Sequence, residues 1–387
     1  MTSVVVVGDG ISALASTVGL IQLGVPATLV RPHHTVGSDP SVLPWHVLPS
    51  LDALDVLDEL VAAGRPSRQR QVRVLATGEC LTIDLAGAPD LIGHPFDIGC
   101  SGALLRSILL TRVVASDLVQ IIDAAVTGVT QDEDHVALAL ATSADDEVRV
   151  TAPWVIAADG VGSAMRRLLG VGFPGTTWQE RCVDVSLDPD FDFADYAGTT
   201  VQVDPRFGAV LRRSVDGWRY LYAEPLAHPG ATVGDRVVPT LAAVHPAAAS
   251  AVQAWTSARM HERAASTFRA GRVLLAGGAA HATNPLSGLG TAASLRDATA
   301  VVRALSAVFR SASEEHLLDV YADSRRREFL DRVLPASVEL KNLTTQISDP
   351  QRLDTELEQY RRAAVSQTAL TELLALEDPW AEGSSVF

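Results

Sequence analysis

A short segment near the amino terminus has the residue types and spacing that bind a pyrophosphate. The segment is Gly8-Asp9-Gly10-Ile11-Ser12-Ala13, which follows an apolar run and opens a stretch of helical periodicity. Gly8 permits a tight turn, Gly10 lets backbone N–H groups approach an anion at the positive end of the helix, and Ala13 allows close packing of helix on strand. The pattern predicts a dinucleotide-binding turn, with a plain tight turn as the competing interpretation.

The second strand of such a unit normally ends in a carboxylate that accepts hydrogen bonds from a ribose. This sequence has Arg31 there. A guanidinium has donors only, so it cannot replace that acceptor. Two interpretations stay open: Arg31 binds a 2′-phosphate, or its side chain faces solvent. The irregular loop suggested by Pro32, His33 and His34 favours the second.

Two later segments also place glycines next to short apolar runs. One runs from Trp154 to Arg166 and contains Asp159-Gly160, and the other runs from Gly271 to Gly290 and contains Gly277-Gly278. In this order and spacing, the three glycine-bearing segments resemble those of the flavoprotein aromatic hydroxylases. That superfamily consists of FAD-dependent monooxygenases with the fold of para-hydroxybenzoate hydroxylase. The resemblance covers most of the chain from Met1 to Arg332.

The resemblance implies an FAD cofactor held mainly by these turns. Asp159 and Gly160 would support the pyrophosphate region. The turn Pro285-Leu286-Ser287-Gly288-Leu289-Gly290 would direct backbone N–H groups at the pyrimidine edge of the flavin, where they stabilise negative charge. NAD(P)H would reduce the flavin. The protein would supply no nucleophile, because the flavin and dioxygen deliver the oxygen atom.

Several expected FAD contacts are missing. Gly278 stands where the family has an aspartate that binds the ribityl chain, Ala292 replaces an asparagine, and Cys100-Ser101-Gly102 occupies the region of an expected arginine. Each lost hydrogen bond costs roughly 0.5 to 1.5 kcal/mol, so three or four losses weaken FAD binding by roughly a few powers of ten. Either other residues compensate, or the chain has kept the fold and given up its flavin.

Two segments favour one branch of the superfamily. His34-Thr35-Val36-Gly37-Ser38-Asp39 and the turn from Asn284 to Gly288 resemble the branch that contains flavin-dependent halogenases and the flavoproteins that hydroxylate tryptophan in peptide-derived quinone cofactors. The halogenases of that branch use a lysine and a Trp-x-Trp-x-Ile-Pro segment, and the sequence has neither. Halogenation is therefore disfavoured.

His281 and a group of later residues are the candidate catalytic and substrate-binding side chains. His281 lies at the family's histidine position beside the cofactor turn, where a proton relay and a packed histidine bonded to carbonyls are both open interpretations. The candidate substrate residues are Trp178, Arg212, Trp218, Tyr220 and Tyr222. The last three alternate along one strand and share a face. That face either lines the cleft over the flavin or packs on its own core.

Hydrophobic periodicity predicts an α/β fold with a Rossmann-like nucleotide-binding domain, which the resemblance implies is an FAD-binding domain. Strand 3–7, helix 11–23 and strand 27–30 form a βαβ unit, which implies a buried parallel sheet. A helix is expected at 51–63, a hairpin at 72–83, a three-stranded meander at 125–151 and a helix at 291–309. Alternating runs at 199–224 indicate an antiparallel sheet, and the chain after 314 is mainly helical.

The predicted substrate domain is inserted into the FAD-binding domain, and a helical carboxyl terminus follows. The expected division is residues 1–70, 101–175 and 266–330 for the FAD-binding domain, 71–100 for a substrate-domain hairpin, 176–265 for the substrate domain and 331–387 for the terminal helices.

Composition excludes several classes of partner. Hydrophobic residues make up 47% of the chain and charged residues 20%, as in ordinary globular proteins. The net charge of -15 disfavours nucleic acid and anionic membranes. Three scattered cysteines, with no basic leader and no long apolar run, indicate a cytoplasmic protein without disulfides or a metal site. We expect a monomer or homodimer.

Three functional hypotheses remain. The first is an FAD-dependent monooxygenase of secondary metabolism that acts on an aromatic or polyketide-like small molecule, or on a carrier-bound or peptide substrate. The second is a flavin-free descendant that catalyses cyclisation, dehydration or isomerisation in the same cleft, with acids or bases such as His281 or Asp159. The third is a non-catalytic binding partner.

Overall fold

The computed structural model describes residues 4–32, 42–88, 93–142, 147–347 and 349–380. Its first sheet is built around β1 (Val4–Val7), four valines that are all buried. A β-branched run buried on both faces is typical of a central parallel strand. β1 pairs in parallel with β2 (Ala27–Arg31) on one side and with β11 (Trp154–Ala157) on the other. The predicted βαβ unit is therefore present.

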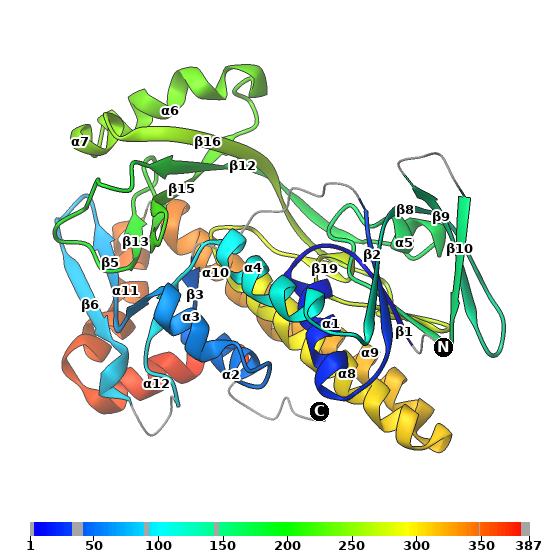
Figure 1. Cartoon of the computed structure of the whole chain (residues 1–387). Coiled ribbons are helices and arrows are strands. Elements are labelled where there is room, and N and C mark those ends of the chain that lie inside the picture. Colours follow the sequence, from blue (N-terminus) through cyan, green and yellow to red (C-terminus); the bar gives the residue numbers. More distant parts are fainter. Residues whose placement is uncertain (1–3, 33–41, 89–92, 143–146, 348, 381–387) are drawn as a thin grey trace.

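This first sheet has eight strands in the order β10-β9-β8-β2-β1-β11-β18-β17. Its remaining strands are β8 (Val119–Gln131), β9 (Val136–Thr142), β10 (Glu147–Ala152), β17 (Arg269–Ala270) and β18 (Val273–Leu275). The predicted meander corresponds to β8, β9 and β10, which pair antiparallel at one edge. Four helices accompany the sheet: α1 (Ile11–Gln22), α4 (Gly102–Val114), α5 (Ala164–Leu168) and α8 (Leu289–Arg310). α1 packs against both α4 and α8 (Figure 1).

A second eight-stranded sheet forms the other half of the molecule. Its order is β19-β16-β12-β15-β14-β13-β5-β6. The strands are β5 (Gln69–Val74), β6 (Cys80–Asp84), β12 (Gly175–Leu187), β13 (Thr199–Val203), β14 (Ala209–Ser214), β15 (Gly217–Pro225), β16 (Val252–Ala264) and β19 (His281–Ala282). The sheet is antiparallel, as predicted, except where β13 pairs in parallel with β5 from the separate amino-terminal hairpin. α6 (Val233–Ala242) and α7 (Pro246–Ala249) lie over β15 and β16 (Figure 1).

The helix predicted at 51–63 is wrong in one respect, because two helices occupy that region. α2 (Leu48–Asp52) and α3 (Leu57–Ala63) are separated at Asp55, whose φ of 56° is left-handed. An aspartate tolerates that conformation better than most residues, and it ends the first helix. A small sheet of β3 (Val42–Leu43), β4 (Arg65–Ser67) and β7 (Asp97–Gly99) adjoins them.

The carboxyl-terminal part is helical, as predicted. α9 (His316–Glu328) continues through a π-helical turn at Phe329–Val333 into α10 (Leu334–Thr345), and α11 (Pro350–Val365) and α12 (Gln367–Glu377) form a hairpin. α11 packs on β6, and α10 packs on β13 and β14 (Figure 1). The terminal helices therefore cover one end of the second sheet.

Some expectations lie beyond what the structure tests. The segment from His34 to Asp39 falls outside the described residues, so the part of the branch assignment that depends on it stays a prediction. The exact domain boundaries also stay predictions. Among the described residues, no helix combines the length and apolarity needed to cross a membrane.

Candidate active site

The three glycine-bearing turns meet at the ends of β1, β11 and β18. A Cβ atom built on Gly8 would lie 2.2 Å from the carbonyl oxygen of Ala158. One built on Gly277 would lie 2.7 Å from the Cβ of Ser12, and one built on Gly278 would lie 3.0 Å from the Cα of Gly160. Each turn therefore touches another, although about 270 residues separate Gly8 from Gly278. Glycine is required where backbones approach this closely.

Backbone groups in this cleft are open to a ligand. Cβ atoms built on Gly10, Gly160 and Gly162 would meet nothing within 4 Å. The amino terminus of α1 has no side-chain cap and no acidic residue in its first turn, so its N–H groups are available to an anion. This cradle fits the pyrophosphate of FAD. Gly8, Gly10, Ile11, Ser12 and Ala13 form its first wall.

Asp159 and Arg166 shape the second turn. The Asp159 carboxylate accepts hydrogen bonds from Ser163 Oγ at 2.5 Å and from the N–H of Met165 at 3.0 Å, so it caps α5. Arg166 donates to the carbonyl oxygens of Ala279 at 2.9 Å and Val161 at 2.7 Å, which ties the second turn to the third. Direct FAD contact by Asp159 stays a prediction, and its carboxylate is already occupied in holding the turn.

Arg31 is ion-paired. Its Nε and Nη2 atoms donate to the two carboxylate oxygens of Asp123 at 2.8 and 3.0 Å. The two residues are register partners, Arg31 at the end of β2 and Asp123 within β8, and the Asp123 side chain is half exposed. A carboxylate is therefore present near the end of β2, supplied by the neighbouring strand. A 2′-phosphate contact by Arg31 would have to compete with this ion pair.

An arginine also reaches the first turn, although it is absent from the expected position. Arg106, in the second turn of α4, pairs with the Asp9 carboxylate and donates from Nε to the Asp9 carbonyl oxygen at 3.0 Å. The sequence contained no spacing signal for this contact, because 97 positions separate the two residues. Arg31–Asp123 and Arg106–Asp9 place new charged groups near two of the missing FAD contacts. Ala292 is buried in the core.

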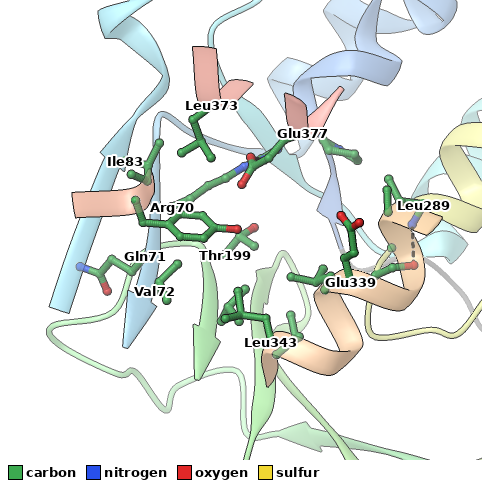
Figure 2. Close-up of a pocket in the computed structure, with 18 of the residues that line it drawn as sticks. Arg70, Gln71, Val72, Ile83, Thr199, Leu289, Glu339, Leu343, Leu373 and Glu377 are labelled. Atoms are coloured by element: carbon green, nitrogen blue, oxygen red, sulfur yellow. Dashed lines mark hydrogen bonds and ion pairs between the residues drawn. The ribbon is translucent and has the colours of Figure 1, made fainter. Parts of the chain in front are cut away.

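A cavity of about 530 Å³ opens beside the Pro285–Gly290 turn. Ser287, Gly288 and Leu289 form the wall nearest the amino terminus of α8. The rest of the wall mixes apolar side chains with polar and charged ones (Figure 2), and the apolar ones include Val72, Ile83, Val201, Val210, Leu343 and Leu373. β5, β6, β13, β14, α10, α11 and α12 all contribute residues.

Arg212 connects this cavity to the turn. Its guanidinium donates to the carbonyl oxygens of Leu286 at 2.7 Å and Pro285 at 3.3 Å, and a Cβ atom on Gly288 would lie 2.8 Å from its Nη2. Burial lowers the pKa of Arg212 below its usual range. Among the described residues, no carboxylate lies within ion-pairing distance of it. Arg212 thus brings a positive charge, held by carbonyls, to the predicted flavin edge.

Many further polar and charged side chains line the cavity. Arg70 and His46 are two of them, and neither was a main candidate in the sequence. Arg70 donates to both oxygens of Asp97 at 2.7 Å and lies 3.4 Å from Glu377 (Figure 2). His46 is 7% exposed and its Nδ1 has no partner within the described residues. Burial, and then the charge of Arg70, hold the pKa of His46 well below its usual value. His46 is therefore a neutral imidazole in the cavity wall.

The predicted aromatic lining is placed differently from the expectation. Trp218, Tyr220 and Tyr222 do share one face of β15, but that face packs beneath α6 and α7 in the core of the second sheet. On the opposite face of the sheet, Arg212 and Val210 of the neighbouring strand β14 line the cavity. Trp178 lies beneath the Lys341 ammonium, 4.0 Å from its ring centre, outside the cavity wall. Strand alternation identified the shared face but not its direction.

His281 lies in a buried network. Its Nε2 is 2.8 Å from Asp297 Oδ2, and its ring stacks on Phe329 at 4.5 Å. Asp297 also accepts hydrogen bonds from Arg325 Nε at 2.8 Å and from the N–H of Gly277 at 2.9 Å. His281 is therefore packed, but its partner is the Asp297 carboxylate and not the backbone carbonyls of the packed-histidine interpretation; through Asp297 it holds the third turn. Its catalytic role stays an untested prediction.

Comparisons with known proteins agree with this architecture. A family model described as "FAD binding domain" matches residues 1–337. 6-Hydroxy-3-succinoylpyridine 3-monooxygenase of Pseudomonas putida is 32% identical over 349 residues, 88% of each chain. Para-nitrophenol 4-monooxygenase of a Pseudomonas species is 32% identical over 251 residues, 63% of this chain and 62% of that protein. The crystal structure of p-nitrophenol 4-monooxygenase from Pseudomonas putida matches with a TM-score of 0.91 and 27% identity, covering 98% of both chains.

Proposed function

The chain belongs to the FAD-dependent aromatic monooxygenases with the para-hydroxybenzoate hydroxylase fold, and from that premise we propose that it hydroxylates a small aromatic ring that carries an acidic hydroxyl group. The family match favours this function over the flavin-free alternative. Among the relatives named above, none is a halogenase or a peptide-tryptophan hydroxylase, so the branch assignment stays a prediction.

The observation that carries the proposal is the cavity beside Ser287–Leu289. Its volume of about 530 Å³ suits a one- or two-ring molecule, and the apolar part of its wall, which includes Val72, Val210 and Leu343, offers a surface for the ring. Arg212 supplies a buried positive charge that favours an ionised hydroxyl or a reduced flavin nearby. The two relatives are named for a hydroxypyridine and a nitrophenol, which are rings of this size and acidity.

The side chains and turns have separate tasks in this function. FAD, when bound and reduced by NAD(P)H, uses dioxygen to supply the oxygen atom. The open N–H groups at Gly10 and the start of α1 would hold its pyrophosphate, and the turn at Ser287–Leu289 would hold its ring. Val72, Leu343 and their apolar neighbours orient the substrate. Because α11 and α12 wall the cavity, we propose a free small molecule in preference to a carrier-bound or peptide substrate.

Two measurements test the proposal. The purified protein, supplied with FAD, should show a flavin absorption band, and 6-hydroxy-3-succinoylpyridine or 4-nitrophenol should accelerate its oxidation of NADH or NADPH. In ¹⁸O₂, the hydroxylated product should gain one labelled oxygen atom. A protein that stays colourless with excess FAD would instead support the flavin-free alternative. A flavoprotein that oxidises NAD(P)H at the same rate with every hydroxylated ring would contradict the proposed substrate class.

A further inference from the structure

A chain of hydroxyl groups leads from the cavity wall to a buried carboxyl group. Ser287 lines the cavity at the turn before α8. The Oγ of Ser337, in α10, donates toward Ser287 Oγ at 3.1 Å and toward Glu262 Oε1 at 3.2 Å. These three residues come from the turn, from α10 and from β16, and they connect the predicted flavin edge to the interior of the second sheet.

Glu262 is suited to holding one proton. It is 3% exposed, and its Oε1 accepts hydrogen bonds from Asn284 Nδ2 at 2.6 Å and from Trp178 Nε1 at 3.4 Å. Its Oε2 is buried without a partner among the described residues. The donors to Oε1 stabilise the ionised carboxylate, whereas burial and the unpaired Oε2 favour the uptake of a proton. Burial accordingly raises the pKa of Glu262 above its usual value.

The two serines can reverse their hydrogen bonds. A hydroxyl donates one hydrogen bond and accepts two, so the Ser337 proton can point to either neighbour. In the structure, Ser287 Oγ donates to the Asn284 carbonyl oxygen at 2.9 Å and accepts from the N–H of Leu289 at 3.3 Å. Rotation of its hydroxyl toward Ser337 completes a path in the direction of Glu262.

We propose that Ser287, Ser337 and Glu262 form a proton relay for the hydroxyl group of the substrate. The O–H bond of the substrate breaks as its proton passes to Ser287 Oγ, the Ser287 proton passes to Ser337 Oγ, and the Ser337 proton passes to Glu262 Oε1. One negative charge moves from the carboxylate to the substrate oxygen, and nothing is oxidised or reduced. Return of the proton to the product restores the relay. The relay rests on the proposed function, because it requires an ionisable ring hydroxyl.

The charged groups around Glu262 are already engaged elsewhere. The Lys341 ammonium, on α10, pairs with Glu180 of β12 at 2.8 Å. His261 and Arg263, the neighbours of Glu262 on β16, both bond the hydroxyl of Thr177 at 2.9 Å. Arg212 contacts the Pro285 and Leu286 carbonyl oxygens of the turn. None of these cations pairs with the Glu262 carboxylate among the described residues, so the carboxyl group remains free to take up a proton.

The test uses the full FAD-loaded chain with 4-nitrophenol, whose phenolate form is coloured. At a pH where the free probe is mostly neutral, we expect the wild-type protein to bind it as phenolate without releasing a proton to a weakly buffered indicator solution. Glu262→Gln keeps the shape and the bond to Asn284 but cannot accept the proton. The ratio of bound phenolate to bound phenol should fall at least about tenfold, which corresponds to a rise of about one unit in the pKa of the bound probe.

Two variants separate the relay from a structural role. Ser337→Ala breaks the path while leaving Glu262 in place, and it should reproduce the tenfold loss. Thr344→Ala removes another fully buried hydroxyl from α10, one that bonds only its own helix at Leu340, and it should leave the probe spectrum unchanged. FAD content checks that each variant folds.

The outcomes distinguish the relay from the proposed function. If wild type, Glu262→Gln and Ser337→Ala bind the same fraction of the probe as phenolate at every pH, the relay alone is overturned. Binding of neutral 4-nitrophenol by wild type, or release of its proton to solution, would overturn it as well. Failure of the wild-type flavoprotein to bind 4-nitrophenol in either form would contradict the relay and the proposed substrate class together.

Discussion

The FAD cleft and the substrate cavity are built in different ways. Backbone makes the cleft, in the turns at Gly8, Gly160 and Gly278, which touch one another. Side chains make the cavity, and they come from two hairpins, a turn and three carboxyl-terminal helices. A site made of backbone N–H groups survives the loss of individual side chains. A site made of side chains changes with every substitution, which suits a surface that selects the substrate.

The departures from the family motif in the cleft follow from this difference. Arg31 replaces the expected acceptor at the end of β2, but the Asp123 carboxylate lies beside it. The expected arginine before α4 is absent, but Arg106 of α4 contacts the first turn. The glycines and the free amino terminus of α1, which no side chain can replace, are all retained. The sequence predicts that three or four lost contacts weaken FAD binding. It does not predict that charged groups from other segments lie near two of the lost contacts.

The largest effect in the cleft is expected from Gly8→Ala. The new methyl group would lie 2.2 Å from the Ala158 carbonyl oxygen, at a φ of +142° that disfavours side chains. Strain and overpacking together should lower the unfolding free energy by roughly 3 kcal/mol or more, with loss of FAD. Urea unfolding and FAD titration measure both. Gly10→Ala is the matched control for stability alone, because its methyl group meets no protein atom within 4 Å and should leave the unfolding free energy unchanged.

How far the sequence predicted each region follows from the same contrast. A tight turn requires glycine at a fixed position, so Gly8, Gly160 and Gly277 predict the cleft from the sequence alone. The sheets and the terminal helices also followed from periodicity. The layer that each face of β15 contacts could not be predicted in this way. Alternation shows that Trp218 and Tyr222 share a face, but not which elements cover that face. The Arg31–Asp123 ion pair could not be predicted either, since a contact between residues 92 positions apart depends on strand order.

Arg212→Met should have the largest effect in the cavity. It removes two hydrogen bonds to the turn and the buried positive charge, so kcat/KM should fall by about 10- to 100-fold. FAD affinity should change much less, because the pyrophosphate cradle is separate. Arg213→Met, one residue later on the other face of β14, is the control. An equal loss of FAD affinity and of kcat/KM in Arg212→Met would break the distinction between the two regions.

His46, in the cavity wall, makes the free energy of unfolding depend on pH. Its folded pKa lies below the unfolded value of 6.5, so the unfolded chain binds more protons below that pH. The contribution to stability is fully present above pH 6.5 and is lost as the pH falls, by up to about 1.4 kcal/mol per pH unit. Urea unfolding near pH 7.5 and pH 5.5 should show a steeper loss in wild type than in His46→Asn. If the unfolding free energy falls by the same amount in wild type and in His46→Asn, His46 is not buried as a neutral base.

Gly278 offers the smallest and most selective comparison. Restoring the family's aspartate supplies an acceptor worth about 0.5 to 1.5 kcal/mol, but its Cβ would lie 3.0 Å from the Gly160 Cα and the Val161 N, which forces the second turn to move. The sequence alone predicts that Gly278→Asp tightens FAD binding; the structure limits the net change to less than about tenfold. Gly278→Ala carries the same Cβ without the carboxylate. FAD titration should therefore rank Asp above Ala by about threefold or more, and equal affinities would mean that no ribityl hydroxyl lies within reach of position 278.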